Sequence, residues 1–246
     1  MANEEKYAVV TGCASGIGYE IANSLNNKGI HVIGLDIETI NDKFLSYVCD
    51  VSDENQVAVI MQKIKGKTSR IDYLVNAAGM LTIGNPLLIK ELSLKQWDAI
   101  MRINLRSVLI MIKNIYPFMK EANGGSIVNI SSEQSFNPDV SFSPYAVSKA
   151  GINMLTLSAA KEFLNDNIRV NAIALGTVKT NILKNMTITP EQELEMYHNK
   201  EKEIPFGVIE KQSVFELVDF LLSDKSRYIT GEIVRCDGGL FLGSKK

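Results

Sequence analysis

Thr11-Gly-Cys-Ala-Ser-Gly-Ile-Gly18 is the stretch that decides the fold of this 246-residue chain. It follows a short apolar run, Tyr7–Thr11, that is typical of a buried strand, and it leads into Gly16–Lys28, whose pattern predicts a helix. A glycine-rich turn between a strand and a helix lets backbone N–H groups approach a pyrophosphate at the helix N-terminus. The stretch therefore predicts a nucleotide-binding unit made of one strand, one turn and one helix.

The rest of the chain continues this alternation of apolar, β-branched runs and helical patterns, which is typical of a parallel sheet covered on both faces. We predict one α/β domain over residues 1–246: a Rossmann-type, doubly wound parallel sheet of about seven strands with helices on both faces. The predicted strands are Tyr7–Thr11, His31–Leu35, Leu45–Val48, Tyr73–Asn76, Ser126–Ile130, Arg169–Ala174 and Ile233–Cys236. The predicted helices are Gly16–Lys28, Asp53–Lys65, Leu94–Lys120, with a cap at Ser93, and Tyr145–Leu164.

Two connections depart from the regular alternation. Only residues 37–44 remain between the second and third strands, too few for a crossover helix, because such a connection needs about ten to twelve residues. We expect a loop or a single helical turn there. The connection over residues 177–207 is long and contains Pro190 and Pro205, so we expect it to form a lid over a substrate site.

Charge and cysteine content argue against several kinds of function. The net charge is −2, and acidic and basic residues are mixed along the chain, so we expect neither nucleic acid nor a membrane surface as a partner. No apolar run approaches the length of a membrane span, and Met1–Lys6 shows no signal-peptide pattern. Cys13, Cys49 and Cys236 lack metal-ligand spacing. We therefore predict no metal site, and buried thiols in a reducing cytoplasm.

Tyr145-Ala-Val-Ser-Lys149, with Ser132 upstream, is the pattern that indicates catalysis. A lysine four residues after a tyrosine lies on the same face of a helix. Because an unperturbed tyrosine has a pKa of about 10, we expect the charge of Lys149 to lower the pKa of Tyr145 toward neutral pH. Ser132 would hydrogen-bond the substrate oxygen. These residues supply a proton donor, and hydride must come from a cofactor because no side chain can provide one.

A second tyrosine–lysine match, Tyr116-Pro-Phe-Met-Lys120, serves as an internal control. It has no serine at the corresponding distance upstream, and Pro117 directly follows its tyrosine. We interpret it as the end of the long helix and as a chance match.

Asp36, at the end of the second predicted strand, is the residue that we expect to select the cofactor. A carboxylate at this strand end can accept hydrogen bonds from both hydroxyls of an adenosine ribose, and it would repel a 2′-phosphate. No arginine lies near Asp36 in the sequence, so we predict NAD(H) in preference to NADP(H). Asp50, at the end of the third strand, has two open roles: a contact with the adenine amino group, or a purely structural one.

Together these residues resemble the short-chain dehydrogenase/reductase family over nearly the whole chain. Asn76-Ala77-Ala78-Gly79 resembles its sheet-stabilising segment, and Tyr228-Ile-Thr-Gly231 and Asp237-Gly-Gly239 are similar to its C-terminal signature. The resemblance implies that the chain interconverts a secondary alcohol and a ketone on a small-molecule substrate. It implies a catalytic set that consists of Ser132, Tyr145, Lys149 and Asn104, the last of which would hold a water relay to the lysine.

The resemblance also implies where the cofactor binds. Lys149 would contact the nicotinamide ribose, and Val178 and Thr180 the carboxamide. The complete set of expected cofactor-binding residues is Gly12, Ser15, Gly16, Ile17, Gly18, Asp36, Asp50, Val51, Asn76, Ala77, Ala78, Gly79, Tyr145, Lys149, Val178 and Thr180.

Two branches of the family are similar to this chain. The 3-oxoacyl-carrier-protein reductases share its length and motifs, but their carrier-docking arginines align with Ser126 and Asp166 here, which argues against an acidic carrier partner. The 2,3-dihydro-2,3-dihydroxybenzoate dehydrogenases share the short second crossover and a segment like residues 74–81. Glu133 stands where many relatives have a small residue, and it faces either the substrate or a solvated rim.

Two further expectations concern assembly and a rival function. The predicted helices offer more apolar positions than one sheet face can cover, so we expect a homotetramer in which they pair, with a second contact through Asp237–Leu242. These positions are Ile100, Ile103, Leu105, Val108, Leu109, Ile112, Ile115, Ile152, Met154, Leu155 and Leu157. The rival to an enzyme is a nucleotide-sensing protein that has kept the fold without the chemistry, and such a protein should have lost Tyr145 or Lys149.

Overall fold

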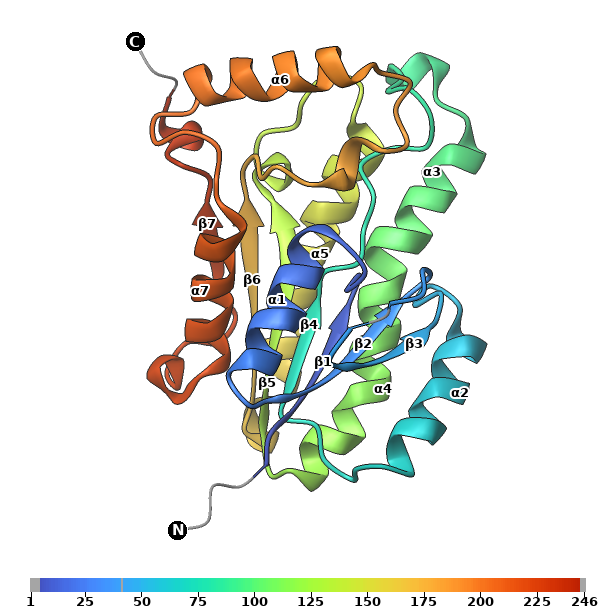
Figure 1. Ribbon diagram of the computed structural model, residues 1–246, viewed down its shortest axis with the longest axis vertical. Helices are drawn as coiled ribbons and strands as arrows, with labels where there is room; N and C mark the ends of the chain where they lie inside the picture. The colour runs from blue at the N-terminus through green and yellow to red at the C-terminus, as the bar shows by residue number, and fades with distance from the viewer. Residues whose placement is uncertain (1–4, 41, 244–246) are drawn as a thin grey trace.

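The strands form one seven-stranded parallel sheet in the order β3-β2-β1-β4-β5-β6-β7 (Figure 1). The computed structural model describes residues 5–40 and 42–243. The strands are β1 (Tyr7–Thr11), β2 (His31–Asp36), β3 (Leu45–Val48), β4 (Tyr73–Asn76), β5 (Gly125–Ser132), β6 (Ile168–Leu175) and β7 (Ile233–Cys236). The predicted doubly wound sheet is confirmed, and each predicted strand is found with its ends shifted by two residues at most.

Helices cover both faces of the sheet, which explains why the central strands are apolar throughout. In β1, Ala8 and Val10 pack in the core on the side of α1 (Gly16–Asn27) and α7 (Lys211–Leu222). Val9 points to the opposite core, with helices α2 (Glu54–Lys65), α4 (Ser107–Glu121) and α5 (Ser143–Glu162). A strand that is buried on both faces needs apolar side chains at every position, not at alternate ones.

The strand order reverses at β1: β2 and β3 are added on one side of it, and β4 to β7 on the other. In open parallel sheets, ligands bind in the crevice outside the carboxyl ends of the strands at such a switch point. The glycine turn follows β1 at this crevice, and Ala77–Gly79 follows β4 beside it. The topology thus brings two distant parts of the sequence to one place.

The predicted helical stretch Leu94–Lys120 is found, with a π-helical turn within it. It begins after Ser93, whose side chain forms a capping box with Gln96, and runs as α3 (Leu94–Met101). A π-helical turn, Arg102–Arg106, then separates α3 from α4. A π-helical turn contains one more residue than an α-helical turn, and such turns are frequent at functional sites. The predicted helical stretch is therefore confirmed, and its π-helical turn was not predicted because apolar periodicity does not reveal a single inserted residue.

The two irregular connections differ from each other as predicted. The residues described between β2 and β3 contain no helix. The connection over residues 177–207 carries α6 (Pro190–Glu203), which lies across the top of the molecule in Figure 1. Thr189 and Gln192 form its capping box, and Pro190 occupies the first turn, where a missing N–H costs nothing. The sequence analysis missed this helix and α7.

The outer surfaces of α4 and α5 carry fewer exposed apolar side chains than the sequence suggested. Ile100, Val108, Ile112, Ile115 and Ile152 are buried in the core. Leu109, Met154 and Leu157 remain exposed, as does Val147, which the sequence analysis did not single out. In the described part of the chain, no helix is long and apolar enough to cross a membrane.

A chain of buried amides joins the sheet to α5 beneath the crevice. The Asn76 side chain donates to Asn129 Oδ1 at 2.8 Å, and Asn129 Nδ2 donates to Thr156 Oγ1 at 2.9 Å. Asn129 and Thr156 are inaccessible to solvent. The chain therefore ties β4, β5 and α5 together, the three elements whose ends carry Ala77–Gly79, Ser132 and Tyr145.

The Asn129→Ala variant should lower the free energy of unfolding by about 1–3 kcal/mol, because it leaves the buried amide of Asn76 without an acceptor. Urea unfolding measures this loss. Asn137→Ala removes a solvent-exposed amide that lies outside this buried network, and it should change the free energy of unfolding by less than about 0.5 kcal/mol. Equal unfolding midpoints for the two variants would contradict the structural role given to Asn129.

Candidate active site

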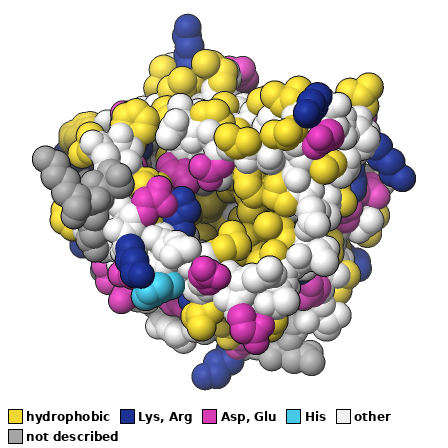
Figure 2. Space-filling model, turned by 90° about the horizontal axis from the view of Figure 1, so that it is seen from above, with side chains coloured by type: hydrophobic (Ala, Val, Ile, Leu, Met, Phe, Trp, Pro, Cys, Tyr) yellow, Lys and Arg dark blue, Asp and Glu magenta, His cyan; other side chains and the backbone are white. Residues whose placement is uncertain are grey.

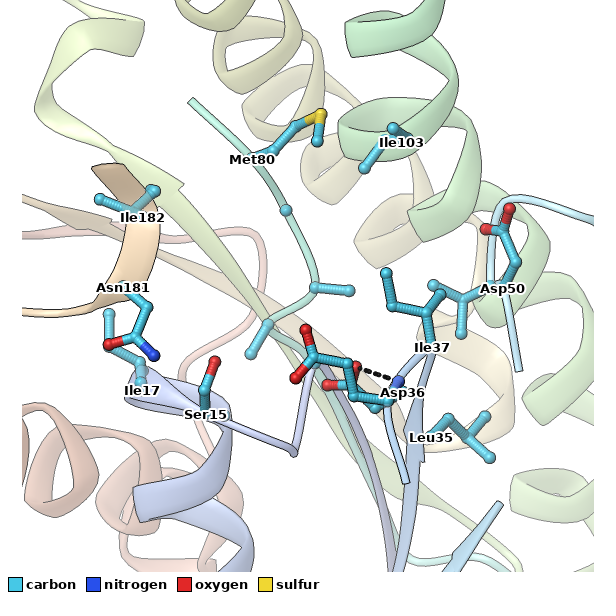
Figure 3. Close-up of a pocket in the computed structure, with 18 of the residues that line it drawn as sticks. Ser15, Ile17, Leu35, Asp36, Ile37, Asp50, Met80, Ile103, Asn181 and Ile182 are labelled. Atoms are coloured by element: carbon cyan, nitrogen blue, oxygen red, sulfur yellow. Dashed lines mark hydrogen bonds between the residues drawn. The ribbon is translucent and has the colours of Figure 1, made fainter. Parts of the chain in front are cut away.

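The carboxyl ends of β1, β2 and β4 surround a cavity of about 350 Å³ (Figure 3). Of the expected cofactor-binding residues, twelve line it: Gly12, Ser15, Gly16, Ile17, Gly18, Asp36, Asp50, Val51, Ala77, Ala78, Gly79 and Thr180. Asn76 lines neither this cavity nor its neighbour, because its side chain points into the amide chain below. The elements that hold these residues are far apart in sequence and meet only at the switch point.

Two positions of the turn can hold only glycine, because a side chain there would collide with neighbouring backbone. Gly12 has a φ of +69°, and a Cβ there would lie 2.8 Å from the backbone of Ala78. At Gly18 a Cβ would lie 2.1 Å from the carbonyl oxygen of Gly12. The first turn of α1 therefore packs directly on the end of β1, and its N–H groups face the cavity without side chains in the way.

Asp36 has its carboxylate at the base of the glycine turn. One oxygen accepts a hydrogen bond from the backbone N–H of Ala14 at 2.8 Å, and the other accepts from that of Glu38 at 3.1 Å. These bonds fix the orientation of the carboxylate. Each carboxylate oxygen can accept more than one hydrogen bond, so acceptor capacity remains for a ligand.

Arg102 is a residue in this cavity that the sequence analysis missed. It lies in the π-helical turn, and its guanidinium contacts Asp50 Oδ2 at 3.2 Å and the hydroxyl of Ser52. Hydrogen bonds from Ser52 and Arg102 lower the pKa of Asp50 against the opposing effect of burial. No local signal in the sequence could have found Arg102, because the contact joins residues 50 positions apart.

A surface ion pair lies at the edge of the cavity. Lys184, which follows the short 3-10 turn Asn181–Leu183, contacts Glu38 Oε1 at 2.8 Å. Both residues line the cavity, and the pair joins the connection over residues 177–207 to the loop after β2. The two basic residues of the cavity, Arg102 and Lys184, are therefore both paired with carboxylates.

A second cavity of about 210 Å³ contains Ser132, Tyr145 and Lys149. Ser132 ends β5, and the other two lie in the first turns of α5, where Pro144 helps to start the helix. All three are nearly buried. The two cavities share Ile17, Ala77, Gly79, Thr180 and Ile182 along their common wall, so the predicted proton donor opens toward the cavity of the glycine turn.

Lys149 is held from the sheet side. Its Nζ donates to the carbonyl oxygen of Ile130 at 2.7 Å and lies 5.5 Å from the centre of the Tyr145 ring. Burial lowers the pKa of Lys149 to about 8. The ammonium therefore remains the main form at neutral pH, in a position where it can act on the neighbouring tyrosine.

The expected lowering of the pKa of Tyr145 is not found in the ligand-free structure. Burial raises the pKa of Tyr145 to about 12, a hydrogen bond with Ser132 opposes the rise, and the charge of Glu133 adds to it. The expectation was wrong in sign because it counted the charge of Lys149 and left out the cost of burying a phenolate.

The hydroxyl of Ser132 is positioned by hydrogen bonds to its neighbours. Its Oγ accepts from the backbone N–H of Gln134 at 3.2 Å, lies 3.5 Å from Glu133 Oε2, and also hydrogen-bonds the hydroxyl of Tyr145. That second contact is too long to hold the proton firmly. The hydroxyl of Ser132 therefore lies beside that of Tyr145 on the wall of the cavity.

Asn104 lies beside this cavity without lining it. Its side chain accepts from the backbone N–H of Met80 and donates to the carbonyl of Met80, both at 2.9 Å, and it donates to Ser148 Oγ at 3.1 Å. A Cβ on Gly79 would lie 3.4 Å from Asn104 Oδ1 and 3.6 Å from Lys149 Nζ. The missing side chain of Gly79 leaves a space between the amide and the lysine.

The remaining predicted contacts lie on the connection after β6. Val178 lines the second cavity and forms a bridge with Ile209. Thr180 lines both cavities, and its backbone N–H donates to the hydroxyl of Tyr197 in α6 at 3.3 Å. The position of α6 thus determines that of Thr180.

The control match lies away from both cavities. The hydroxyl of Tyr116 donates to Asp166 Oδ2 at 2.9 Å, and Lys120 contacts the same carboxylate at 3.4 Å. The Tyr116 ring stacks on Phe163. This tyrosine–lysine pair has structural neighbours only, and neither residue lines either cavity.

Comparison with known proteins gives consistent matches over most of the chain. The sequence profile of the family described as enoyl-(acyl carrier protein) reductase matches residues 12–241. The 3-oxoacyl-(acyl-carrier-protein) reductase of Thermotoga maritima is 34% identical over 252 residues, covering 97% of this chain and 99% of that protein. The 2,3-dihydro-2,3-dihydroxybenzoate dehydrogenase of Escherichia coli is 30% identical and covers 96% of each.

A solved structure is similar over the same extent. The ligand-free aldohexose dehydrogenase of Thermoplasma acidophilum matches with a TM-score of 0.88 and 29% sequence identity, covering 97% of this chain and 94% of that one. The chain therefore shares both sequence and fold with proteins named as reductases and dehydrogenases.

Proposed function

Because this chain belongs to the short-chain dehydrogenase/reductase family, an oxidoreductase family that uses nicotinamide cofactors, we propose that it interconverts a secondary alcohol and a ketone with NAD(H). The observation that carries the proposal is the meeting of Ser132, Tyr145 and Lys149 in a cavity that shares a wall with the cavity of the glycine turn. The glycine turn fits a dinucleotide, because its cradle is free of side chains at Gly12 and Gly18.

In the oxidative direction, each residue of the site has a separate role. When bound, NAD⁺ would supply the acceptor for the hydride of the carbinol carbon, so that this carbon becomes the carbonyl carbon of a ketone and the cofactor is reduced to NADH. The Tyr145 phenolate takes the proton of the substrate hydroxyl. Ser132 donates a hydrogen bond to the substrate oxygen and holds it in position. Lys149 favours the phenolate by its charge, and Asn104, across the space beside Gly79, completes a water-mediated route for the proton.

Two branches of the family remain as alternatives for the substrate and partner: the 3-oxoacyl-carrier-protein reductases and the dihydrodiol dehydrogenases. A 3-oxoacyl-carrier-protein reductase is disfavoured, because Ser126 is buried with its hydroxyl donating to the carbonyl of Leu221, and Asp166 is acidic and paired. Neither residue offers a cation to an acidic carrier. A dihydrodiol dehydrogenase meets no such objection. A nucleotide-sensing protein without activity ranks lowest, because Tyr145 and Lys149 are both present and both buried at one cavity.

The preference for NAD(H) is supported by the charges around Asp36. An adenosine 2′-phosphate would need an unpaired cation here, yet Arg102 and Lys184 are paired with carboxylates. In Figure 3, Ile37 lies between Asp36 and Asp50, and it is 65% exposed. An apolar side chain at this position gives a phosphate nothing to bind.

Three other expectations belong to the same proposal. The chain acts as one domain, the connection over residues 177–207 is its substrate lid, and the protein works in the cytoplasm. The lid is supported by Met196, Tyr197 and Lys200 of α6, which form one wall of the second cavity.

A homotetramer is supported by the exposed apolar residues of α4 and α5. Leu109, Val147, Met154 and Leu157 are between 42% and 63% exposed. In α5, residues 147, 154 and 157 form one stripe at helical spacing. The C-terminal segment adds Phe241 and Leu242, which are 45% and 89% exposed. Each patch can pair with its own copy across a two-fold axis, and two such axes give a tetramer.

The Tyr145→Phe variant should bind NADH normally and lose about 100-fold or more of its kcat, because only the proton-transferring hydroxyl is removed. Fluorescence titration and steady-state rates measure the two quantities. Tyr116→Phe is the matched control from the second motif and should leave kcat unchanged. A Tyr145→Phe enzyme with most of the wild-type rate would refute the proposed proton donor.

Replacing Asp36 by Ala and Ile37 by Arg should weaken NADH binding and strengthen NADPH binding, changing the ratio of their dissociation constants by about tenfold or more. The cause is the exchange of carboxylate repulsion for a charge-assisted contact. Calorimetric titration of both cofactors tests it. Wild-type protein that binds NADPH more tightly than NADH would refute the preference.

Sedimentation at micromolar concentration should give a tetramer. Met154→Arg should reduce it to a dimer, because it places a charge in the apolar stripe of α5, whereas Val59→Arg changes a lone exposed valine of α2 and should leave the tetramer intact. A stable and active wild-type monomer would refute both proposed interfaces. A wild-type dimer would support one interface and refute the other.

A further inference from the structure

Glu133 is a carboxylate inside the cavity of Ser132 and Tyr145 that the proposed reaction does not use. It follows Ser132 directly and begins a 3-10 turn, Glu133–Ser135. Its carbonyl accepts hydrogen bonds from the N–H groups of Phe136 and Asn137, at 2.9 and 3.1 Å, so the turn fixes its position. Of the two readings that the sequence left open, the structure places Glu133 on the wall of the substrate cavity.

This carboxylate forms no close ion pair in the described part of the chain, and the charge of Lys200 acts on it only from a longer distance. In the described part of the chain no basic group lies within 4 Å of it, and its only polar side-chain contact is Ser132 Oγ at 3.5 Å. Lys200 lines the same cavity, but its Nζ pairs with Glu203 at 2.9 Å. Burial raises the pKa of Glu133 to about 7. A half-buried carboxylate without partners gains most from a ligand that donates a hydrogen bond.

The position relative to Ser132 says where on the substrate that donor must be. Ser132 holds the reacting oxygen, and the carboxylate of Glu133 begins 3.5 Å from that hydroxyl. The group within its reach is therefore a substituent on the carbon next to the reacting carbon. A hydroxyl there would donate to Glu133 while the reacting oxygen is held by Ser132.

The surrounding charges exclude an anionic substrate at this end. Asp139 lines the cavity together with Glu133 and Lys200, and Figure 2 shows several acidic side chains and a basic one at the rim of the hollow. A carboxylate or phosphate on the substrate would meet two acidic groups and a lysine already paired with Glu203. A 3-oxoacyl group offers no hydroxyl beside its ketone and would leave Glu133 without a donor.

We propose that Glu133 determines specificity by accepting a hydrogen bond from a hydroxyl adjacent to the reacting carbon, and that the substrate is an uncharged vicinal diol. The inference rests on the proposed function, because Ser132 and Tyr145 define where the substrate lies. Glu133 takes no proton in the reaction. It selects the substrate that presents a second hydroxyl, and the cavity of about 210 Å³ limits that substrate to a small molecule.

The test compares each vicinal diol with the alcohol that lacks the second hydroxyl. NADH formation is followed with butane-2,3-diol against butan-2-ol, and with cis-cyclohexane-1,2-diol against cyclohexanol. The wild-type enzyme should favour the diol in kcat/KM by about tenfold or more, the range expected for a hydrogen bond to a charged group. Glu133→Leu should bring the ratio close to one, and Glu133→Gln, which keeps an acceptor without the charge, should give an intermediate ratio.

Asn137→Leu is the matched control, since it changes a polar residue of the same loop that does not line this cavity, and its ratio should equal that of the wild type. NADH titration and thermal melting establish that each variant is folded. Equal kcat/KM for diols and simple alcohols in the wild type, or a preference that survives in Glu133→Leu, overturns the inference and leaves the proposed function standing. A wild-type enzyme that binds NADH and oxidises none of the four alcohols overturns the diol class, and a wild-type enzyme inactive toward every secondary alcohol and ketone refutes the proposed function itself.

Discussion

The seven strands of the sheet are parallel, so all of them end at the same edge, and the rest of the molecule depends on this constraint. At the switch point it places the ends of β1 and β4 side by side, and the hydroxyl of Thr11 accepts hydrogen bonds from the N–H groups of both Ala77 and Ala78 at 3.1 Å. This one buried side chain joins the glycine turn to the segment after β4. The cavity of the glycine turn therefore has two walls that are fixed to each other by the sheet.

The chemistry of the second cavity is governed by burial acting on three ionisable groups of different kinds. Burial raises the pKa of Tyr145 and Glu133 and lowers the pKa of Lys149, so each group is moved toward its neutral form. The pKa values of Tyr145 and Lys149, which are similar in water, are thereby moved apart, to about 12 and about 8. A hydrogen bond from Ser132 favours the phenolate, and the charge of Glu133 disfavours it. The cavity is thus a place where small changes in charge alter the proton affinity of the tyrosine.

The likeness to known proteins and the local chemistry of the site carry different information. Relatives named as carrier-protein reductase, dihydroxybenzoate dehydrogenase and aldohexose dehydrogenase match this chain to similar extents, so overall similarity does not select among them. The side chains that line the second cavity include Glu133, Asp139 and residues of α6. Fold and reaction class follow from what the relatives share, and the substrate must be argued from these side chains.

The sequence by itself determined the seven strands, the helices before β6, the glycine turn, and the pairing of Tyr145 with Lys149, because each is a local pattern with a characteristic period or spacing. It also separated this pair from Tyr116 and Lys120, through the absence of an upstream serine. It did not reveal α6 or α7. It could not reveal the π-helical turn around Asn104, because apolar periodicity does not show a single inserted residue. It could not reveal the ion pairs of Arg102 and Lys184 either, because these join residues that are distant in the chain. It also gave the pKa of Tyr145 the wrong sign, because burial belongs to the folded molecule. Only the tertiary structure decided that Glu133 lies on the wall of the second cavity with no close ion pair among the described residues, since the positions of β5, α5 and α6 together determine what surrounds it.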